Sequence, residues 1–98
     1  MQVTRHIHVT GVVQGVGFRP FVYGLAARLD LRGWVCNTSG GVEIDVQGND
    51  ADVERFIRSL AEDAPPLARI DSITATLESS EIEYSTMDIR HSTVVDGA

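Results

Sequence analysis

A run of glycines followed by an arginine is the feature of this sequence best suited to bind an anion. It reads Gly11-Val12-Val13-Gln14-Gly15-Val16-Gly17-Phe18-Arg19-Pro20. Glycine adopts backbone angles closed to other residues, so consecutive N–H groups in such a loop can converge on one oxyanion. A helix beginning near Pro20 would add the positive end of its dipole, and Arg19 a guanidinium that can bind phosphate through two hydrogen bonds. The glycines alone leave a second interpretation open, in which they form only a tight turn and Arg19 is solvated.

Two common nucleotide-binding loops do not fit this run. A triphosphate-binding loop has Lys and then Ser or Thr directly after its last glycine, whereas Phe18 and Arg19 follow Gly17. A dinucleotide-binding loop aligned on Gly15 and Gly17 needs a third glycine where Pro20 stands. Both comparisons disfavour nucleotide binding.

Charge and composition indicate which kinds of binding partner the chain can have. The net charge of −6 argues against a nucleic acid, because phosphate backbones are bound by excess Lys and Arg. Residues 1–37 nevertheless hold four arginines against the single acid Asp30, so a small anion is expected to bind there. The one cysteine, Cys36, excludes an internal disulfide, and no apolar stretch is long enough for a membrane span or a signal peptide. We therefore expect a cytoplasmic protein with neither nucleic acid nor membrane as a partner.

The 98 residues suffice for one domain, expected over residues 1–92, with 93–98 as a tail or interdomain linker. Hydrophobic periodicity predicts, in order, a strand over 5–13, a helix over 20–30, a hairpin of strands over 32–38 and 42–46, a helix between Asn49 and Pro65, a strand near 72–77 and a weaker strand over 86–91. In the strand near 72–77, the side chains of Ile73, Ala75 and Leu77 are expected to face inward. This order is typical of the ferredoxin-like βαββαβ sandwich, an α+β fold whose antiparallel sheet carries two helices on one face, here with an extra C-terminal edge strand.

The glycine run and a second motif together resemble the acylphosphatase family over about residues 4–92. The second motif comprises Gly33-Trp34-Val35-Cys36-Asn37-Thr38 and Gly41-Val42-Glu43-Ile44. The resemblance implies a metal-free and cofactor-free hydrolysis of acyl phosphates, with the substrate itself helping to take the proton of the attacking water. It also implies a role for particular residues. The phosphoryl group would be bound by Gly15, Val16, Gly17, Phe18 and Arg19, with Arg19 as the essential clamp and Asn37 positioning the water.

Two further segments are similar to the amino-terminal domain of the HypF family, the carbamoyltransferases of nickel–iron hydrogenase maturation. They are Pro20-Phe21-Val22 and the stretch from Pro65 to Ile73. This similarity implies carbamoyl phosphate as substrate, and as partners the remaining domains of a larger parent chain and the hydrogenase maturation proteins. Two alternatives stay open: a non-catalytic module that binds carbamoyl phosphate, and a stand-alone acylphosphatase of broad specificity. The presence of both Arg19 and Asn37 favours catalysis, because a pure binder needs the clamp but has no need of a water-orienting amide.

Other reactive side chains have simpler interpretations. His6 and His8 share a strand face and, with His91, suggest a metal site, but their spacing places no third ligand, so a solvated or hydrogen-bonded face is favoured. Cys36 is expected to be a packed thiol of the core or sheet face, and the acidic stretch 78–83 a solvated loop.

Overall fold

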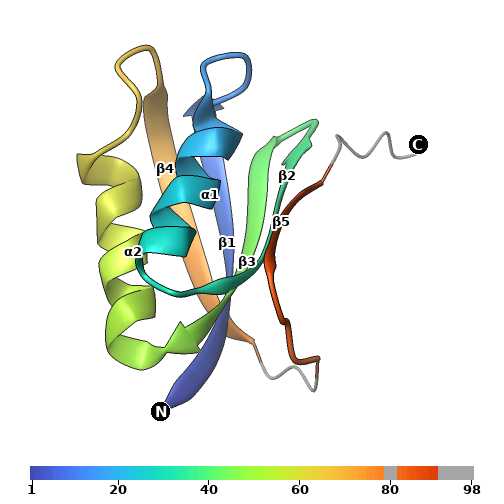
Figure 1. Ribbon diagram of the computed structural model, residues 1–98. Coiled ribbons are helices and arrows are strands. Elements are labelled where there is room, and N and C mark those ends of the chain that lie inside the picture. Colours follow the sequence, from blue (N-terminus) through green and yellow to red (C-terminus); the bar gives the residue numbers. More distant parts are fainter. Residues whose placement is uncertain (79–81, 91–98) are drawn as a thin grey trace.

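The computed structural model describes residues 1–78 and 82–90, and in it two helices cover one face of a five-stranded sheet (Figure 1). The elements are β1 (Gln2–Val12), α1 (Phe18–Arg28), β2 (Arg32–Thr38), β3 (Gly41–Asn49), α2 (Asp50–Glu62), β4 (Arg69–Glu78) and β5 (Met87–Arg90). The strand order is β4-β1-β3-β2-β5, and every pair is antiparallel except β2 with β5. The ferredoxin-like fold and its extra strand are confirmed, and the parallel β5 makes the sheet mixed. The expected tail at 93–98 lies outside the described residues.

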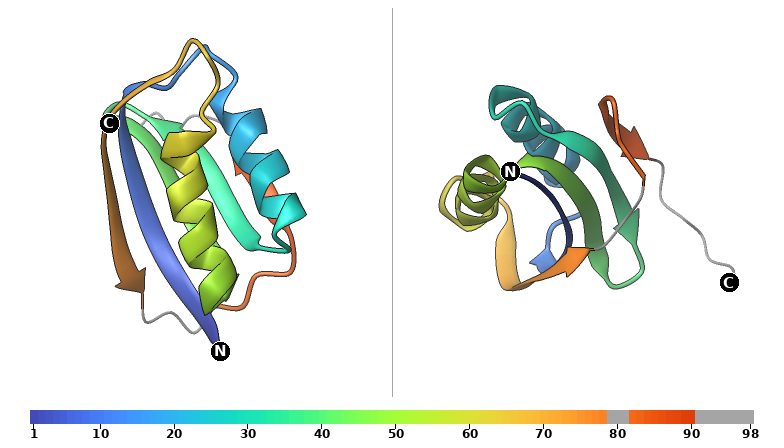
Figure 2. Two further views of the ribbon diagram at one scale, coloured as in Figure 1. Left: turned by 90° about the vertical axis from the view of Figure 1, so that its left-hand side faces the viewer. Right: turned by 90° about the horizontal axis from the view of Figure 1, so that it is seen from below.

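Alternation of apolar and polar residues decides which face of the sheet is buried. Side chains two residues apart in a strand share a face, so Ile7 and Val9 of β1 and the apolar residues of β3 point toward the helices, whereas Val12 at the end of β1 is exposed. Figure 2 shows both helices on that concave face, while the opposite face carries no helix. The core formed between them consists of Ile7, Val9, Val13, Phe18, Val22, Leu25, Ala26, Leu31, Val35, Val42, Ile44, Val46, Val53, Phe56, Leu60 and Met87.

Helix α1 starts and ends two residues earlier than the periodicity predicts. It begins at Phe18 because Gly17, in a left-handed conformation, already caps it, and Pro20 is its third residue. It ends at Arg28 because Asp30 takes a left-handed φ of 58° and the Leu31 N–H donates to the Ala26 carbonyl at 2.9 Å. A chain reversal of this kind closes the last turn of many helices.

Strand β4 corrects one expectation about the core. Ile73 and Ala75 pack against it as expected, but Leu77 is 71% exposed. Leu77 pairs with Arg5 of β1, whose guanidinium binds Glu54 of α2 at 2.7 Å. Next to Leu77, β1 and α2 are thus joined by the Arg5–Glu54 ion pair, whereas next to Ile73 and Ala75 they are joined by the apolar core.

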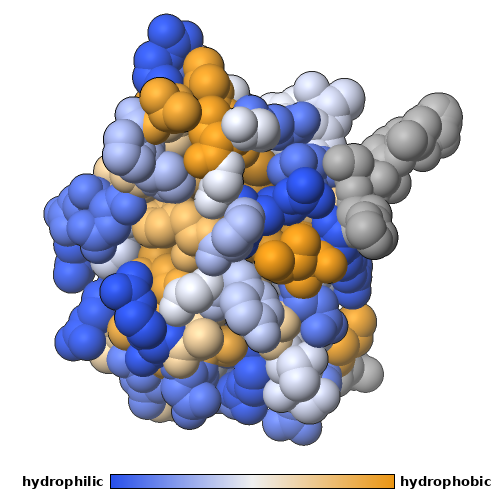
Figure 3. Space-filling model, turned by 45° about the horizontal axis from the view of Figure 1, so that its top comes forward, coloured by the Kyte–Doolittle hydropathy of each residue, from blue (hydrophilic) through white to orange (hydrophobic). Residues whose placement is uncertain are grey.

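Three connections meet at one end of the molecule. The β1–α1 loop, the β2–β3 turn and the α2–β4 connection all lie at the top of Figure 1. Turned toward the viewer in Figure 3, this part of the surface has apolar patches separated by hydrophilic side chains. Neither of the two described helices has the length and apolar character to cross a membrane.

Candidate active site

The β1–α1 loop has the backbone expected of an anion site. Gly15 and Gly17 have φ values of 76° and 80°, in the left-handed region that favours glycine. Gly17 caps α1 without a side-chain hydrogen bond, and the first turn of the helix contains no acidic residue. The positive end of the helix is thus neither capped by a side chain nor neutralised, which is the condition for binding a negative group there.

The side chains of the loop divide between core and surface. Phe18 is buried and packs against Phe21 with 5.5 Å between ring centroids, and Val16 also contacts the core. These contacts anchor the loop to the fold through side chains. Because these side chains pack against the core, Val16 and Phe18 can contribute to binding a phosphoryl group only through their main-chain N–H groups.

Arg19 is held by the edge strand. Its Nη1 donates to the main-chain carbonyl of Arg90 at 3.3 Å. Arg90 is the last residue of β5 and pairs with Cys36 of β2, directly before Asn37. The guanidinium is therefore tethered next to the strand that carries Asn37.

Asn37 lies one residue before the end of β2 and is only 7% exposed. It shares a face with Val35, so its side chain points toward the helix-covered side of the sheet. Its Oδ1 is shielded from solvent and receives no hydrogen bond from any residue in the described ranges 1–78 and 82–90. A buried acceptor without a donor costs about 1–3 kcal/mol, so this oxygen is suited to a substrate group or a water that brings its own proton.

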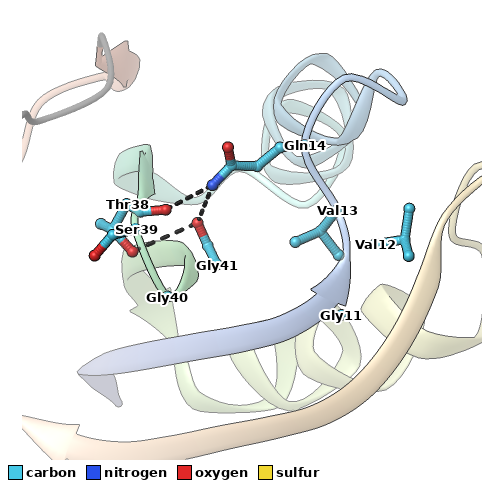
Figure 4. Close-up of a pocket in the computed structure, with 8 residues that line it drawn as sticks. All are labelled: Gly11, Val12, Val13, Gln14, Thr38, Ser39, Gly40 and Gly41. Carbon is cyan, nitrogen blue, oxygen red and sulfur yellow. Dashed lines mark hydrogen bonds between the residues drawn. The ribbon is translucent and has the colours of Figure 1, made fainter.

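Gln14 links the loop to the β2–β3 turn (Figure 4). Its Nε2 donates to the main-chain carbonyls of Thr38, at 2.6 Å, and of Gly41, at 2.9 Å. The two segments line an open cavity of about 330 Å³, formed by Gly11, Val12, Val13, Gln14, Thr38, Ser39, Gly40 and Gly41. The cavity adjoins the proposed phosphoryl loop at Gln14, and residues 15–19 do not line it.

The two links connect the loop to β2 and to its neighbour β5, close to Asn37 in the sheet. Gln14 binds the residue directly after Asn37, and Arg19 binds a carbonyl on β5 beside the residue directly before it. The structure thus brings together the expected phosphoryl loop, the expected clamp and the expected water-positioning amide. Sequence reasoning assigned no role to Gln14 or to the Arg90 carbonyl. Gln14 stood within the motif, whereas nothing in the sequence indicated Arg90.

The open face of the sheet carries the histidines and a buried acid. His6 contacts Asp45 through Nδ1 and Glu43 through Nε2, both at 2.5 Å, and His8 Nδ1 contacts the other oxygen of Glu43. Burial alone would lower the pKa of His6, but the hydrogen bonds and charges of Asp45 and Glu43 outweigh it and raise that pKa above 6.5. This confirms the hydrogen-bonded face expected for His6 and His8, whereas His91 lies outside the described residues.

Two neighbouring expectations have different outcomes. Cys36 is buried, as expected for a packed thiol. The acidic stretch is not simply a solvated loop, because Glu78 ends β4 and Gln47 of β3 binds the Ile82 carbonyl and the Tyr84 N–H, each at 2.9 Å. Residues 79–81 lie outside the described part.

Comparison with known proteins places the chain in a family. The acylphosphatase family profile matches residues 5–89, which is most of the sequence. The chain therefore belongs to the acylphosphatase family.

The relatives of this chain include long proteins, of which it matches a small part, and short proteins, of which it matches almost the whole length. The chain is 47% identical over 92 residues to the carbamoyltransferase HypF2 of Cupriavidus necator, covering 94% of this chain but 11% of that protein. It is 44% identical over 88 residues to the acylphosphatase of Staphylococcus aureus, covering 88% of this chain and 97% of that protein. A crystal structure of full-length HypF in the phosphate- and nucleotide-bound form matches with a TM-score of 0.90 and 41% identity, over 94% of this chain and 12% of that one. The domain is thus related both to the amino-terminal part of HypF carbamoyltransferases and to stand-alone acylphosphatases.

Proposed function

We propose that this chain hydrolyses acyl phosphates, with Arg19 and Asn37 as catalytic residues and residues 15–19 as the phosphoryl-binding loop. One observation carries the proposal: Gln14 ties the loop to Thr38, directly after Asn37, and Arg19 ties it to β5, the strand paired with β2 beside Asn37. An arginine that only formed part of a solvated turn would not need such a tether. A pure anion-binding site would not need a buried asparagine with an unpaired oxygen beside it.

The residues supply binding, charge stabilisation and orientation. The loop N–H groups and the Arg19 guanidinium bind the phosphoryl oxygens, and Asn37 Oδ1 accepts a hydrogen bond from the attacking water. The water oxygen attacks phosphorus, and the bond from phosphorus to the acyl oxygen breaks. The carboxylate, or carbamate, leaves with the electron pair of that bond, and the water proton passes to a phosphoryl oxygen. An acyl phosphate already has a good leaving group, so positioning and electrostatics are sufficient.

Carbamoyl phosphate is the proposed physiological substrate, supported by the similarity to HypF carbamoyltransferases. In that setting the domain would act in the cytoplasm with the other domains of a carbamoyltransferase and with hydrogenase maturation proteins. The similarity to the Staphylococcus aureus acylphosphatase supports the alternative of a broader acyl specificity.

Phosphate release from carbamoyl phosphate and from acetyl phosphate, measured side by side, tests the proposal. Arg19→Ala should lose at least about 100- to 1000-fold in rate, because it removes a donor to the developing charge. Arg19→Lys should not restore the rate, since an ammonium group lacks the planar fork that binds two oxygens. Asn37→Ala should lower kcat more than it raises KM. Arg28→Ala, at the exposed far end of the same helix, is the matched control and should behave like the parent.

The possible results separate the alternatives. Faster turnover of carbamoyl phosphate supports the carbamoyltransferase role, and similar rates for both substrates support broad specificity. Binding of carbamoyl phosphate without phosphate release would show a binding module. An Arg19→Ala protein that is folded and cleaves either substrate at the parental rate would overturn the catalytic assignment.

A further inference from the structure

The open face of the sheet brings three potential metal ligands together from three neighbouring strands. His6 lies on β1, Asp45 is its direct partner on β3, and Glu78 is on β4 two residues past the partner of His6. One ligand atom from each of the three side chains lies within 4.8 Å of the others. Ligands of one zinc ion lie about 3–4 Å apart, because each bond to the metal is about 2 Å long. Small side-chain rotations would therefore close this group around one ion.

Both ring nitrogens of His6 face carboxylates. Its Nε2 contacts Glu43 while its Nδ1 faces Asp45. In the imidazolium form both nitrogens donate, and a metal ion at Nδ1 takes the place of the Nδ1 proton while Nε2–H keeps donating to Glu43. Metal-binding histidines almost always donate their second ring nitrogen to a carboxylate or carbonyl in this way. His8 contacts the other oxygen of Glu43 and so fixes that carboxylate in turn.

The two carboxylates are buried or partly buried, and one of them is poorly satisfied. Asp45 is 4% exposed, and its Oδ2 accepts a hydrogen bond from the Tyr84 hydroxyl at 2.7 Å, which leaves Oδ1 facing His6. Glu78 Oε1 is shielded from solvent and has no hydrogen-bond partner among the residues that the structure describes. Two carboxylates that share a poorly solvated space repel each other, and a divalent cation relieves this repulsion better than one imidazole can.

We propose that His6, Asp45 and Glu78 form a binding site for a divalent transition-metal ion of the zinc class. The mixed nitrogen and oxygen ligands suit zinc, whereas magnesium prefers oxygen ligands in nearly ideal octahedral geometry. Three protein ligands leave a position of a tetrahedral ion open to water. The site lies on the face of the sheet opposite to the one that Asn37 shares with Val35, so it is separate from the proposed catalytic site.

Calorimetric titration of the 98-residue chain with zinc chloride, in chelator-treated and phosphate-free buffer, tests the proposal. We expect one equivalent of zinc to bind, and no saturable binding of magnesium at the same concentrations. His6→Gln and Glu78→Gln should each weaken zinc binding at least tenfold. The matched controls His91→Gln and Glu54→Gln should bind as the parent does, since Glu54 is exposed and paired with Arg5 on the helix side.

A second measurement covers variants that fail to fold. In the parent protein, zinc should shift the Cε1–H NMR signal of His6, assigned through its own backbone resonances, more than that of His91. Binding that His6→Gln and Glu78→Gln leave unchanged would overturn the proposal. So would binding that depends on His91, or no saturation up to about 1 mM zinc. Arg19→Ala should bind zinc normally, so this test succeeds or fails independently of the proposed hydrolysis.

Discussion

Replacement of Gln14 by alanine should impair catalysis more than it impairs folding. The side chain donates to two main-chain carbonyls, of Thr38 and of Gly41, and these bonds connect the phosphoryl loop to the segment after Asn37. A neutral hydrogen bond contributes about 0.5–1.5 kcal/mol to stability, and the bond to Thr38 is exposed, so water can replace part of it. We expect a loss of about 1–2 kcal/mol in the free energy of unfolding for both bonds together.

We expect kcat to fall by a larger factor than the fraction of folded protein does. A displacement of about 1 Å between substrate and catalytic group can cost about 100-fold in rate. Without the bridge the loop and Asn37 no longer share a fixed separation, so kcat should fall by about 10- to 100-fold. Inhibition by inorganic phosphate should weaken much less, because Gly15, Gly17 and Arg19 are all retained.

Urea unfolding, phosphate-release kinetics and phosphate inhibition of Gln14→Ala together test this reasoning. Gln14→Glu keeps the side-chain length but has no N–H to donate, so it should be at least as impaired as the alanine variant. Gln2→Ala is the matched control, because the Gln2 side chain is exposed at the far end of β1, where it accepts a hydrogen bond from Arg32, and its kcat should equal the parental value. A folded Gln14→Ala protein with parental kcat would refute the bridging role.

Three other changes follow from the packing, the backbone and the electrostatics. Gly17→Ala should cost about 1 kcal/mol of stability and weaken inhibition by phosphate, because alanine is strained at a φ of 80° although space for its Cβ is free; unfolding and inhibition assays measure both effects. Phe56→Ala, in the fully buried face of α2, should cost about 3–5 kcal/mol in urea unfolding. In chelator-containing buffer, the stabilisation that comes from the raised pKa of His6 should be complete below pH 6.5 and lost as the pH rises through the folded-state pKa. His6→Gln, which cannot form the charged contacts with Asp45 and Glu43, should lack this component of a stability–pH curve, and an unchanged curve would contradict the assignment.

Local sequence patterns predicted the elements whose stability depends on nearby residues. Strict alternation in residues 42–46 predicts β3, and the run Gly48-Asn49-Asp50 after it offers a helix cap, which Asn49 provides: its Oδ1 accepts from the Ala51 N–H at 3.0 Å. The hairpin of β2 and β3 followed from glycines at a turn between two apolar segments. Each of these features is decided within a few residues of the chain, so the sequence is sufficient to predict it.

Features set by long-range pairing could not be predicted. β5 has four residues, of which only Met87 is buried, so its pattern is weak and its parallel pairing with β2 depends on the assembled fold. The contact between Arg19 and the Arg90 carbonyl depends on that pairing. In the same way, Asp45 reaches His6 across 39 residues of sequence only because β1 and β3 adopt this register. Without a register, the spacing of the histidines placed no further ligand beside them.

The pleat of β2 determines how the two sites of this domain relate. Asn37 and Val35 point toward the helices, whereas Trp34 points to the open face, where its Nε1 donates to the Tyr84 hydroxyl at 3.2 Å. Tyr84 in turn binds Asp45, so the hydrogen-bond network of the proposed metal site ends on the strand that carries the proposed catalytic amide. Neighbouring residues of one strand thus serve opposite faces. The side chains of the proposed catalytic site and of the proposed metal site lie on opposite faces of the sheet. A substitution can therefore remove a ligand of one site and leave every side chain of the other in place.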